Sequence, residues 1–172
     1  MLNRRHLLSA GVAALAFALQ NKNGKAQTMA TTTATKTDTD FRALTEADWK
    51  ARLTKQQFAI LRKHGTERAG TSPLNKEKRK GTFACAGCDK PLFSSDTKFE
   101  SGTGWPSFFK PLDNAVGETE DRTFGMTRTE VHCRRCGGHL GHVFDDGPKP
   151  TGLRYCMDGV ALVFHPAAPS AT

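Results

Sequence analysis

The sequence lacks several features that define common classes of protein. It has no alternation of strands and helices, no glycine-rich phosphate loop, and no internal repeat beyond two short cysteine motifs. These absences argue against a nucleotide-binding α/β domain and against a repeat protein. Beyond the N-terminal segment, no apolar run is long enough to span a membrane as a helix. With 172 residues, the chain is predicted to fold as one domain.

The chain also lacks the charge excess that its composition first suggests. The formal net charge is +8, but residues 1–26 hold four basic residues and no acidic one, which leaves 21 Lys and Arg against 17 Asp and Glu, or +4. A zinc ion bound by four thiolates would remove about two more charges. The basic run at 76–80 is therefore predicted to be a solvated loop, and nucleic acid is not an expected partner.

The two ends of the chain are predicted to lie outside the folded domain. Arg4 and Arg5 precede an Ala-rich apolar run over 7–19, so residues 1–26 resemble a twin-arginine signal peptide that exports the protein to a bacterial periplasm. An uncleaved N-terminal helix or anchor is the alternative. Residues 27–42 are Thr-rich and are predicted to form a disordered linker, as is the tail 167–172. The domain is then 43–166.

Within this domain the pattern predicts two short helices followed by a mainly β fold. Thr45 and Thr54 are each followed three residues later by an acid or an amide, which is typical of a capped helix start, and Gly65 is expected to end the second helix. Beyond Gly81, short apolar segments alternate with turn residues, as in a small antiparallel fold. The predicted strands are 82–85, 92–94, 107–109, 122–127, 130–133, 142–144 and 160–164.

Four of the five cysteines form two Cys-x-x-Cys pairs, Cys85 with Cys88 and Cys133 with Cys136. Two such turns can complete a tetrahedral thiolate site, for which Zn²⁺ is the favoured ion. Export favours two disulfides instead, although a route that carries folded proteins would let zinc bind first. An iron centre is a third interpretation. Four cysteines leave no open position, so one zinc ion here is predicted to be structural.

Cys156 is the remaining cysteine, and it follows Arg154 by two residues. A thiol without a structural use is a candidate nucleophile, and a nearby positive charge would favour its thiolate form. Two other stretches could meet it. Residues 98–109 carry glycines and Trp105, and residues 137–144 carry His139 and His142, which titrate near neutral pH and could donate protons.

Three blocks of this sequence resemble the signatures of the peptide methionine-R-sulfoxide reductases. They are Ser-Gly-Thr-Gly-Trp-Pro-Ser-Phe, Cys-x-x-Cys-Gly-Gly-His-Leu-Gly-His-Val-Phe-x-Asp-Gly-Pro and Gly-x-Arg-Tyr-Cys, in the order of that family. The resemblance covers about residues 45–165. It implies two antiparallel sheets with a structural zinc, and thiol-dependent reduction of the R epimer of methionine sulfoxide in oxidised proteins. The expected reductant is a thioredoxin-like protein or a small thiol, and the expected state is a monomer.

The resemblance and the chemistry together assign a role to each candidate residue. Cys156 would attack the sulfoxide and become a sulfenic acid, and His142 is the closer of the two histidine partners. Trp105 and Phe109 would hold the methyl group of the substrate. The alternatives are an inert Cys156, structural histidines, Trp105 in the core, and Arg154 in a surface ion pair.

Two positions depart from the family pattern. Thr103 stands where many members have a second, resolving cysteine, so an external thiol would have to attack the sulfenic acid directly. Asp158 stands where the family usually has Asn. A carboxylate there would raise the pKa of Cys156 unless it pairs with a histidine or with Arg154.

Two other functions are compatible with parts of the sequence. The paired cysteine turns could form a zinc ribbon that binds nucleic acid or another protein. Alternatively, Cys156 could act as a redox sensor that is oxidised without turnover.

Overall fold

The computed structural model describes residues 39–122 and 125–168. The predicted signal peptide, most of the predicted linker, and residues 169–172 of the predicted tail lie outside the described residues. Among the helices that are described, none has the length and the apolar character needed to cross a bilayer.

The two N-terminal helices begin at the threonines that the sequence indicates. α1 spans Glu46–Arg52 and α2 spans Lys55–Lys63, and each starts with a reciprocal capping box. In α2 the Thr54 hydroxyl accepts from the Gln57 backbone N–H, while the Gln57 side chain accepts from the Thr54 N–H. These bonds satisfy backbone N–H groups that the helix itself leaves unpaired. α2 ends in a left-handed residue at His64, with φ of 54°, just before the predicted stop at Gly65.

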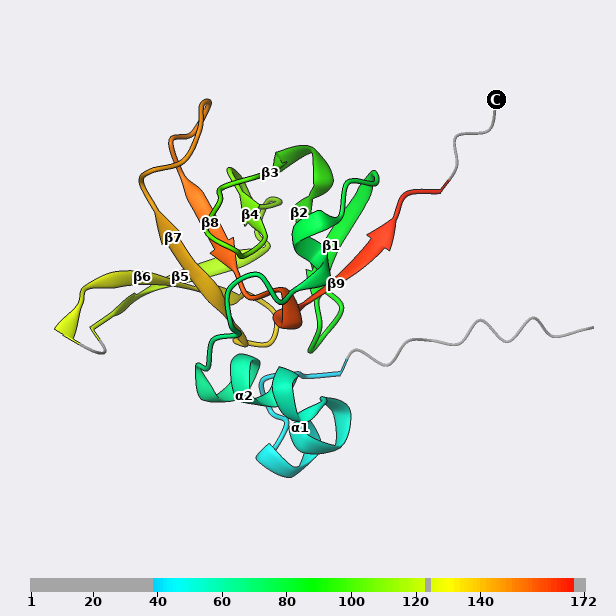
Figure 1. Ribbon diagram of the computed structural model, residues 1–172. Coiled ribbons are helices and arrows are strands. Elements are labelled where there is room, and N and C mark those ends of the chain that lie inside the picture. Colours follow the sequence, from blue (N-terminus) through cyan, green and yellow to red (C-terminus); the bar gives the residue numbers. More distant parts are fainter. Residues whose placement is uncertain (1–38, 123–124, 169–172) are drawn as a thin grey trace, which may run out of the picture. The chain divides into compact units, whose positions relative to one another are not determined.

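The remainder is built from two antiparallel sheets (Figure 1), which confirms the predicted fold class. One sheet has the order β2-β1-β9 and the other β3-β4-β8-β7-β6-β5. The strands are β1 Gly81–Cys85, β2 Pro91–Ser94, β3 Lys98–Phe99, β4 Ser107–Phe108, β5 Val116–Asp121, β6 Arg128–Cys133, β7 His139–Phe144, β8 Arg154–Met157 and β9 Leu162–Pro166; the 3₁₀ turns are η1 Pro73–Lys76, η2 Ser95–Thr97 and η4 Gly159–Ala161.

The predicted strand at 122–127 is wrong. β5 ends at Asp121 and β6 begins at Arg128, and these two residues pair with each other. The chain therefore reverses over this stretch, where Gly125 has a φ of +71° that a strand does not allow. β3, β5 and β8 are strands that the sequence pattern does not indicate.

The two sheets pack through three fully buried phenylalanine rings. Phe108 of β4 contacts Phe93 of β2 at 4.4 Å and Phe83 of β1 at 4.9 Å between ring centroids. Each buried ring contributes roughly 1.5–3 kcal/mol of transfer free energy, with a smaller gain from the ring geometry. This contact holds β4, and with it the neighbouring β8, against the smaller sheet.

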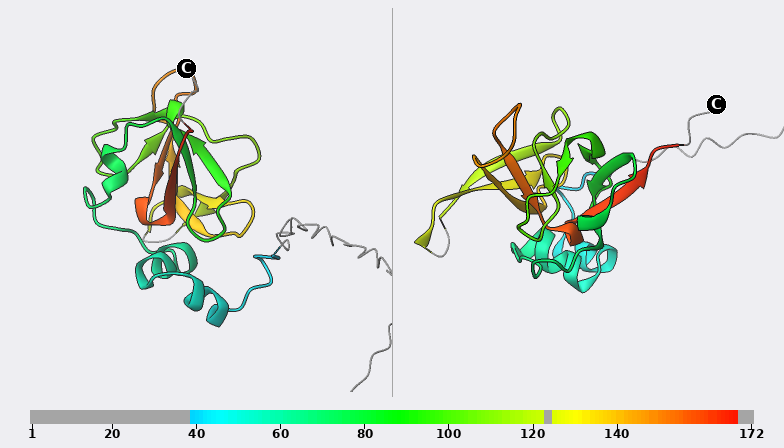
Figure 2. Two further views of the ribbon diagram at one scale, coloured as in Figure 1. Left: turned by 90° about the vertical axis from the view of Figure 1, so that its right-hand side faces the viewer. Right: turned by 45° about the horizontal axis from the view of Figure 1, so that its top comes forward.

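Both helices lie at one end of the β part (Figures 1 and 2). Trp49 of α1 and Leu61 of α2 are buried there, next to the glycines of the two cysteine turns. The segment before α1 also contacts this end, because Phe41 stacks on Trp49 and Arg42 donates to the carbonyl of Arg134 at 2.8 Å. Residues 41 and 42 of the predicted linker therefore contact the domain.

Candidate active site and cysteine cluster

The four paired cysteines converge on one buried point between the two sheets. Cys85 ends β1 in the smaller sheet and Cys133 ends β6 in the larger one. Their sulfur atoms and those of Cys88 and Cys136 all lie within 4.8 Å of one another, with 3.7 Å between Cys85 and Cys136 and 3.5 Å between Cys88 and Cys133. All five cysteines of the chain are free thiols.

These separations fit a tetrahedral metal site. Zn–S bonds of about 2.3 Å place the sulfurs of a tetrahedron about 3.8 Å apart, close to the observed distances. The surroundings stabilise a negatively charged thiolate. The Gly138 N–H points at the Cys136 sulfur at 3.4 Å, and the positively charged Arg62 guanidinium donates to the Cys136 carbonyl. The four thiols therefore have the arrangement that a structural zinc ion requires.

Cys156 lies in β8, between β4 and β7, opposite Ser107 on one side and His142 on the other. Side chains alternate along a strand, so Tyr155 and Met157 are buried in the core while Arg154 and Cys156 share the opposite face. The spacing of two residues between Arg154 and Cys156 thus follows directly from the pleat of the strand.

Gly141 allows β7 to approach the Cys156 backbone closely. It has a φ of +147°, and a Cβ atom at this position would lie 2.1 Å from the Cys156 carbonyl oxygen. No other residue fits without displacing β8. Gly141 therefore sets the distance between the strand that bears Cys156 and the strand that bears the histidines.

Cys156 opens into a cavity of about 140 Å³. The volume suits a group of a few heavy atoms rather than a large ligand. It is lined by Thr66, Trp105, Arg128, Gly141, His142, Phe144, Cys156 and Asp158.

The pKa of Cys156 is raised, chiefly because burial disfavours the thiolate. Thr103 opposes this rise through a contact between its hydroxyl and the sulfur at 3.7 Å, and Arg154 opposes it through its positive charge. Asp158 adds only a small further increase. The expected effect of the carboxylate is therefore present, but burial of the thiol outweighs it.

Arg154 is held beside Cys156 by two partners. Its guanidinium donates two hydrogen bonds to Asp146, at 2.7 and 2.8 Å, and lies 4.3 Å from the centre of the Phe144 ring. Phe144 is the cross-strand neighbour of Arg154. Both contacts fix the position of the positive charge and leave the guanidinium near the thiol.

His139 and His142 approach each other although an ideal strand would turn residues three apart to opposite faces. The β6–β7 pairing shifts register between Val131 and His132, and the two rings end 5.5 Å apart.

Of the two histidines, only His142 lines the cavity, where its Nε2 lies 2.8 Å from an oxygen of Asp121. His139 is buried against Glu130, at 2.7 Å from Nδ1, and burial lowers its pKa.

Asp158 is almost fully buried, and this raises its pKa to about 7. One of its oxygens accepts the Glu67 backbone N–H at 2.8 Å, and the other lies 4.0 Å from His139 Nε2. At neutral pH the carboxyl is therefore protonated in a substantial fraction of molecules, and in that form it resembles the amide of Asn in charge and size.

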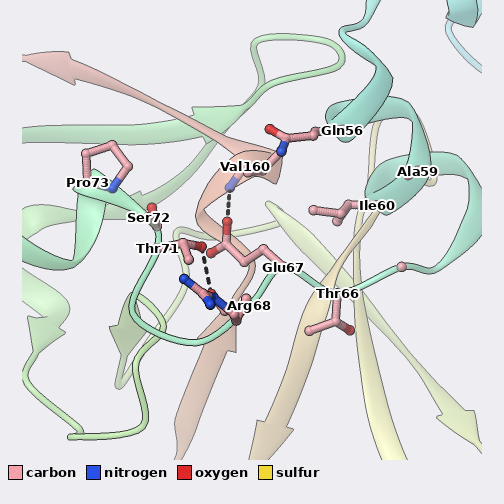
Figure 3. Close-up of a pocket in the computed structure, with 11 residues that line it drawn as sticks. Gln56, Ala59, Ile60, Thr66, Glu67, Arg68, Thr71, Ser72, Pro73 and Val160 are labelled. Atoms are coloured by element: carbon pink, nitrogen blue, oxygen red, sulfur yellow. Dashed lines mark hydrogen bonds between the residues drawn. The ribbon is translucent and has the colours of Figure 1, made fainter.

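Glu67 connects both sides of the cavity. Its carbonyl accepts from the indole N–H of Trp105 at 3.2 Å, and its carboxylate accepts from the N–H groups of Gly159 and Val160. Figure 3 shows this carboxylate pointing to the Val160 nitrogen, beside a separate cavity of about 520 Å³ that Ile60 and Pro73 help to line. Trp105 and the chain after Cys156 are thus tied to one residue.

Several of these residues have no signal in the sequence. Arg128 and Asp121 meet only through the register of the β5–β6 hairpin, and Glu67 binds residues more than ninety positions away, so only the fold identifies them. Phe144 could have been found, because it stands two residues after His142 in the same block of distinctive sequence and therefore on the same face of the strand. Phe109 lies outside the cavity lining; its N–H donates to Thr97, and its carbonyl accepts from Thr151.

Fold and site together define a small β protein that separates a structural cysteine cluster from a second, partly accessible thiol set among ionisable groups. A family model described as the SelR domain matches residues 53–166. The peptide methionine sulfoxide reductase MsrB of Agrobacterium fabrum is 58% identical over 122 residues, which are 70% of this chain and 90% of that protein.

Further relatives give the same result. The proteins of the same name from Leptospira interrogans and Bradyrhizobium diazoefficiens are 57% identical over 120 residues and 50% identical over 133 residues. These matches cover 69% and 77% of this chain, and 92% and 96% of the relatives. The chain belongs to the peptide methionine sulfoxide reductase MsrB family.

Proposed function

We propose that the protein reduces the R epimer of methionine sulfoxide in oxidised proteins to methionine, with Cys156 as the nucleophile. The observation that carries this proposal is the placement of Cys156 in a small cavity together with Trp105, His142 and Asp158. Membership of the MsrB family supports the reaction, and the free fifth thiol supplies its chemistry.

In the first step the Cys156 thiolate takes the sulfoxide oxygen. The Cys156 sulfur attacks the sulfoxide sulfur and forms an S–S bond, and the sulfoxide oxygen takes up a proton. The oxygen then bonds to the Cys156 sulfur as the S–O bond of the substrate and this S–S bond both break. The substrate leaves as methionine, a thioether, and Cys156 is left as a sulfenic acid. Cys156 loses the two electrons that the substrate gains, so the thiol is oxidised as the sulfoxide is reduced.

The proton for the oxygen would come from the ionisable groups around His142. His142 is the histidine that lines the cavity, and His139 lies behind it, within reach of Asp158. A carboxyl with a pKa of about 7 and a neighbouring imidazole can exchange a proton at neutral pH. Arg154 would stabilise the thiolate before the attack.

Trp105 would orient the substrate. Its indole N–H is bound to Glu67, which fixes the ring, and the ring face then offers an apolar wall for the methyl group. Phe144 lines the same cavity and can serve as a second apolar wall.

Recycling of the sulfenic acid requires an external thiol. The thiol attacks the Cys156 sulfur, water leaves, and a second thiol releases the mixed disulfide. Thr103 holds the position next to Cys156, and its hydroxyl cannot form a disulfide. The four clustered thiols would hold one zinc ion, which gives them a structural role.

The predicted export to the periplasm remains a proposal. It rests on the two adjacent arginines before an apolar run near the N-terminus.

The test is a steady-state assay on each pure sulfoxide epimer, with dithiothreitol as the reductant. The R epimer should be reduced by the wild type, and Cys156→Ser should lose at least about 10³-fold of the rate, as expected when a nucleophile is removed. The variant should keep its fold by circular dichroism. Equal rates in both proteins, or reduction of the S epimer alone, would overturn the proposal.

A further inference from the structure

A second group of possible metal ligands lies outside the cysteine cluster. It consists of His64, Glu130 and His139, and the donor atoms of all three lie within 4.8 Å of one another. Glu130 is central, because one of its oxygens lies 3.1 Å from His64 Nδ1 and 2.7 Å from His139 Nδ1. Two imidazoles thus aim the same type of nitrogen at one carboxylate.

From these contacts we infer that His64, Glu130 and His139 form a site for a divalent transition-metal ion of the Zn²⁺ type. Two histidines and one carboxylate are a donor set that such ions prefer. Bonds of about 2.0–2.2 Å place the donors of a tetrahedral ion about 3.4 Å apart. The two nitrogens now lie 3.1 and 2.7 Å from the Glu130 oxygen, so each pair of donors would move apart by less than about 1 Å to admit the ion. The ion would replace the proton that now links His139 to the carboxylate.

The site has one fixed half and one adjustable half. His139 and Glu130 are anchored in neighbouring strands, and their side chains are only 3% and 14% exposed. His64 follows α2, and its side chain is 65% exposed. A rotation of the His64 ring can therefore close the remaining distance without disturbing the core.

An ion can reach this site from solvent. His64, Glu130 and His139 line a cavity of about 420 Å³. Glu120 and Asp121 line it as well, but each is paired with an arginine of the same cavity, Arg122 and Arg128 respectively, so the three ligands themselves must attract the ion. Three protein ligands leave a fourth position open to water or to a small anion. Weak, reversible binding is expected, in contrast to the closed cysteine cluster.

Occupation of the site would affect the neighbouring chemistry. His139 Nε2 faces Asp158, and its ring lies 5.5 Å from that of His142. A metal on Nδ1 would fix this ring and add positive charge behind the proton donors. The resulting slower reduction of methionine sulfoxide rests on the proposed function, whereas binding of the ion does not.

The binding test uses protein that already holds its cluster metal, in a Cys156→Ser background that removes the accessible thiol as a competing ligand. Calorimetric titration with Zn²⁺ should find one additional equivalent. His64→Ala should bind it at least about tenfold more weakly, since one of three ligands is gone. His165→Ala is the matched control, because His165 is also exposed and paired with one carboxylate, Asp89. Equal affinity in His64→Ala, or no additional equivalent, would overturn the site.

The effect on turnover is measured separately in the chain that retains Cys156. Zn²⁺ should slow sulfoxide reduction by the wild type and by His165→Ala, and His64→Ala should keep its rate. Inhibition of His64→Ala to the same degree would show that the ion acts on Cys156 instead, and would overturn this regulatory part. Activity without added Zn²⁺ remains the measure of the proposed function itself.

Discussion

Cys133 and Cys156 belong to the same six-stranded sheet, two strands apart, and yet their surroundings differ in kind. Cys133 is fully buried among three other sulfurs, which act on one another as hydrogen-bond partners. Cys156 borders a cavity and has a hydroxyl, a guanidinium and a carboxyl as neighbours. The role of a cysteine in this sheet therefore depends on how many thiols surround it and on whether solvent can reach it.

The largest effect is expected from breaking the cysteine cluster. Cys88→Ser, or removal of the metal by a chelator, should cost roughly 5 kcal/mol or more of folding free energy, because the ligands join both sheets. Thermal unfolding followed by circular dichroism should show a domain that is unfolded or melts far lower. Cys156→Ser is the matched control and should melt near the wild type. A chelated protein with an unchanged Tm would contradict this prediction.

The next effect concerns Asp158, whose pKa is raised to about 7 from its ordinary value of 3.8. The folded state binds the Asp158 proton more tightly than the unfolded state, so protonation of this carboxyl stabilises the fold. That stabilisation is fully present below about pH 4 and is lost as the pH rises through 7. Asp158→Asn removes the cost of ionisation and should be more stable than the wild type at pH 8, by about 2–4 kcal/mol.

Denaturant unfolding of both proteins at several pH values measures this difference. It should change little between pH 8 and pH 7 and then shrink as the pH falls from 7 to 5. A difference that is constant over that range would show that Asp158 is ionised in the folded protein at pH 5.

A smaller effect is expected at Arg154. Its positive charge lowers the pKa of Cys156, so Arg154→Gln should raise the pH at which the thiol becomes reactive, by about one unit. The rate of alkylation by iodoacetamide as a function of pH reports this midpoint. Asp146→Asn keeps the guanidinium but loses its partner, and should shift the midpoint less. An unshifted midpoint in Arg154→Gln would show that the charge does not reach the thiol.

The smallest effect is expected when a second thiol is placed beside Cys156, which would give it a thiol neighbour as each clustered cysteine has. The Thr103 hydroxyl lies 3.7 Å from the Cys156 sulfur, so Thr103→Cys should form an intramolecular disulfide after one turnover with only a small side-chain rotation. Thiol counting and mass spectrometry would detect the bond. A residue 103 that stays free after oxidation would contradict the proximity of the two side chains.

Local sequence determined the parts of the fold that local interactions hold. The capping boxes at Thr45 and Thr54 involve residues three apart, and both helices begin where the sequence predicts. The same reasoning grouped the four cysteines, because each pair lies on one turn. β8 was missed because Arg154–Met157 is only four residues long, too short for its alternation to be recognised in the sequence, and pairing with strands on both sides is what makes it extended.

The site was predictable to the extent that its residues lie in blocks of distinctive sequence. Trp105, His142 and Cys156 come together in one cavity, as expected. The ion pair of Arg128 with Asp121 and the bonds of Glu67 depend on the hairpin register and on a contact over more than ninety positions. No local pattern encodes either of these contacts.

The position of the cysteine pairs along the chain has a consequence for chain entropy. Cys88 and Cys133 are 45 residues apart, and the segment between them includes Thr103 and Trp105, whereas Cys156 lies beyond it. A metal on the cluster closes this segment into a loop and reduces the conformations open to it before folding is complete. The metal would thus restrict the segment that carries Thr103 and Trp105, whereas Cys156 lies outside the closed loop.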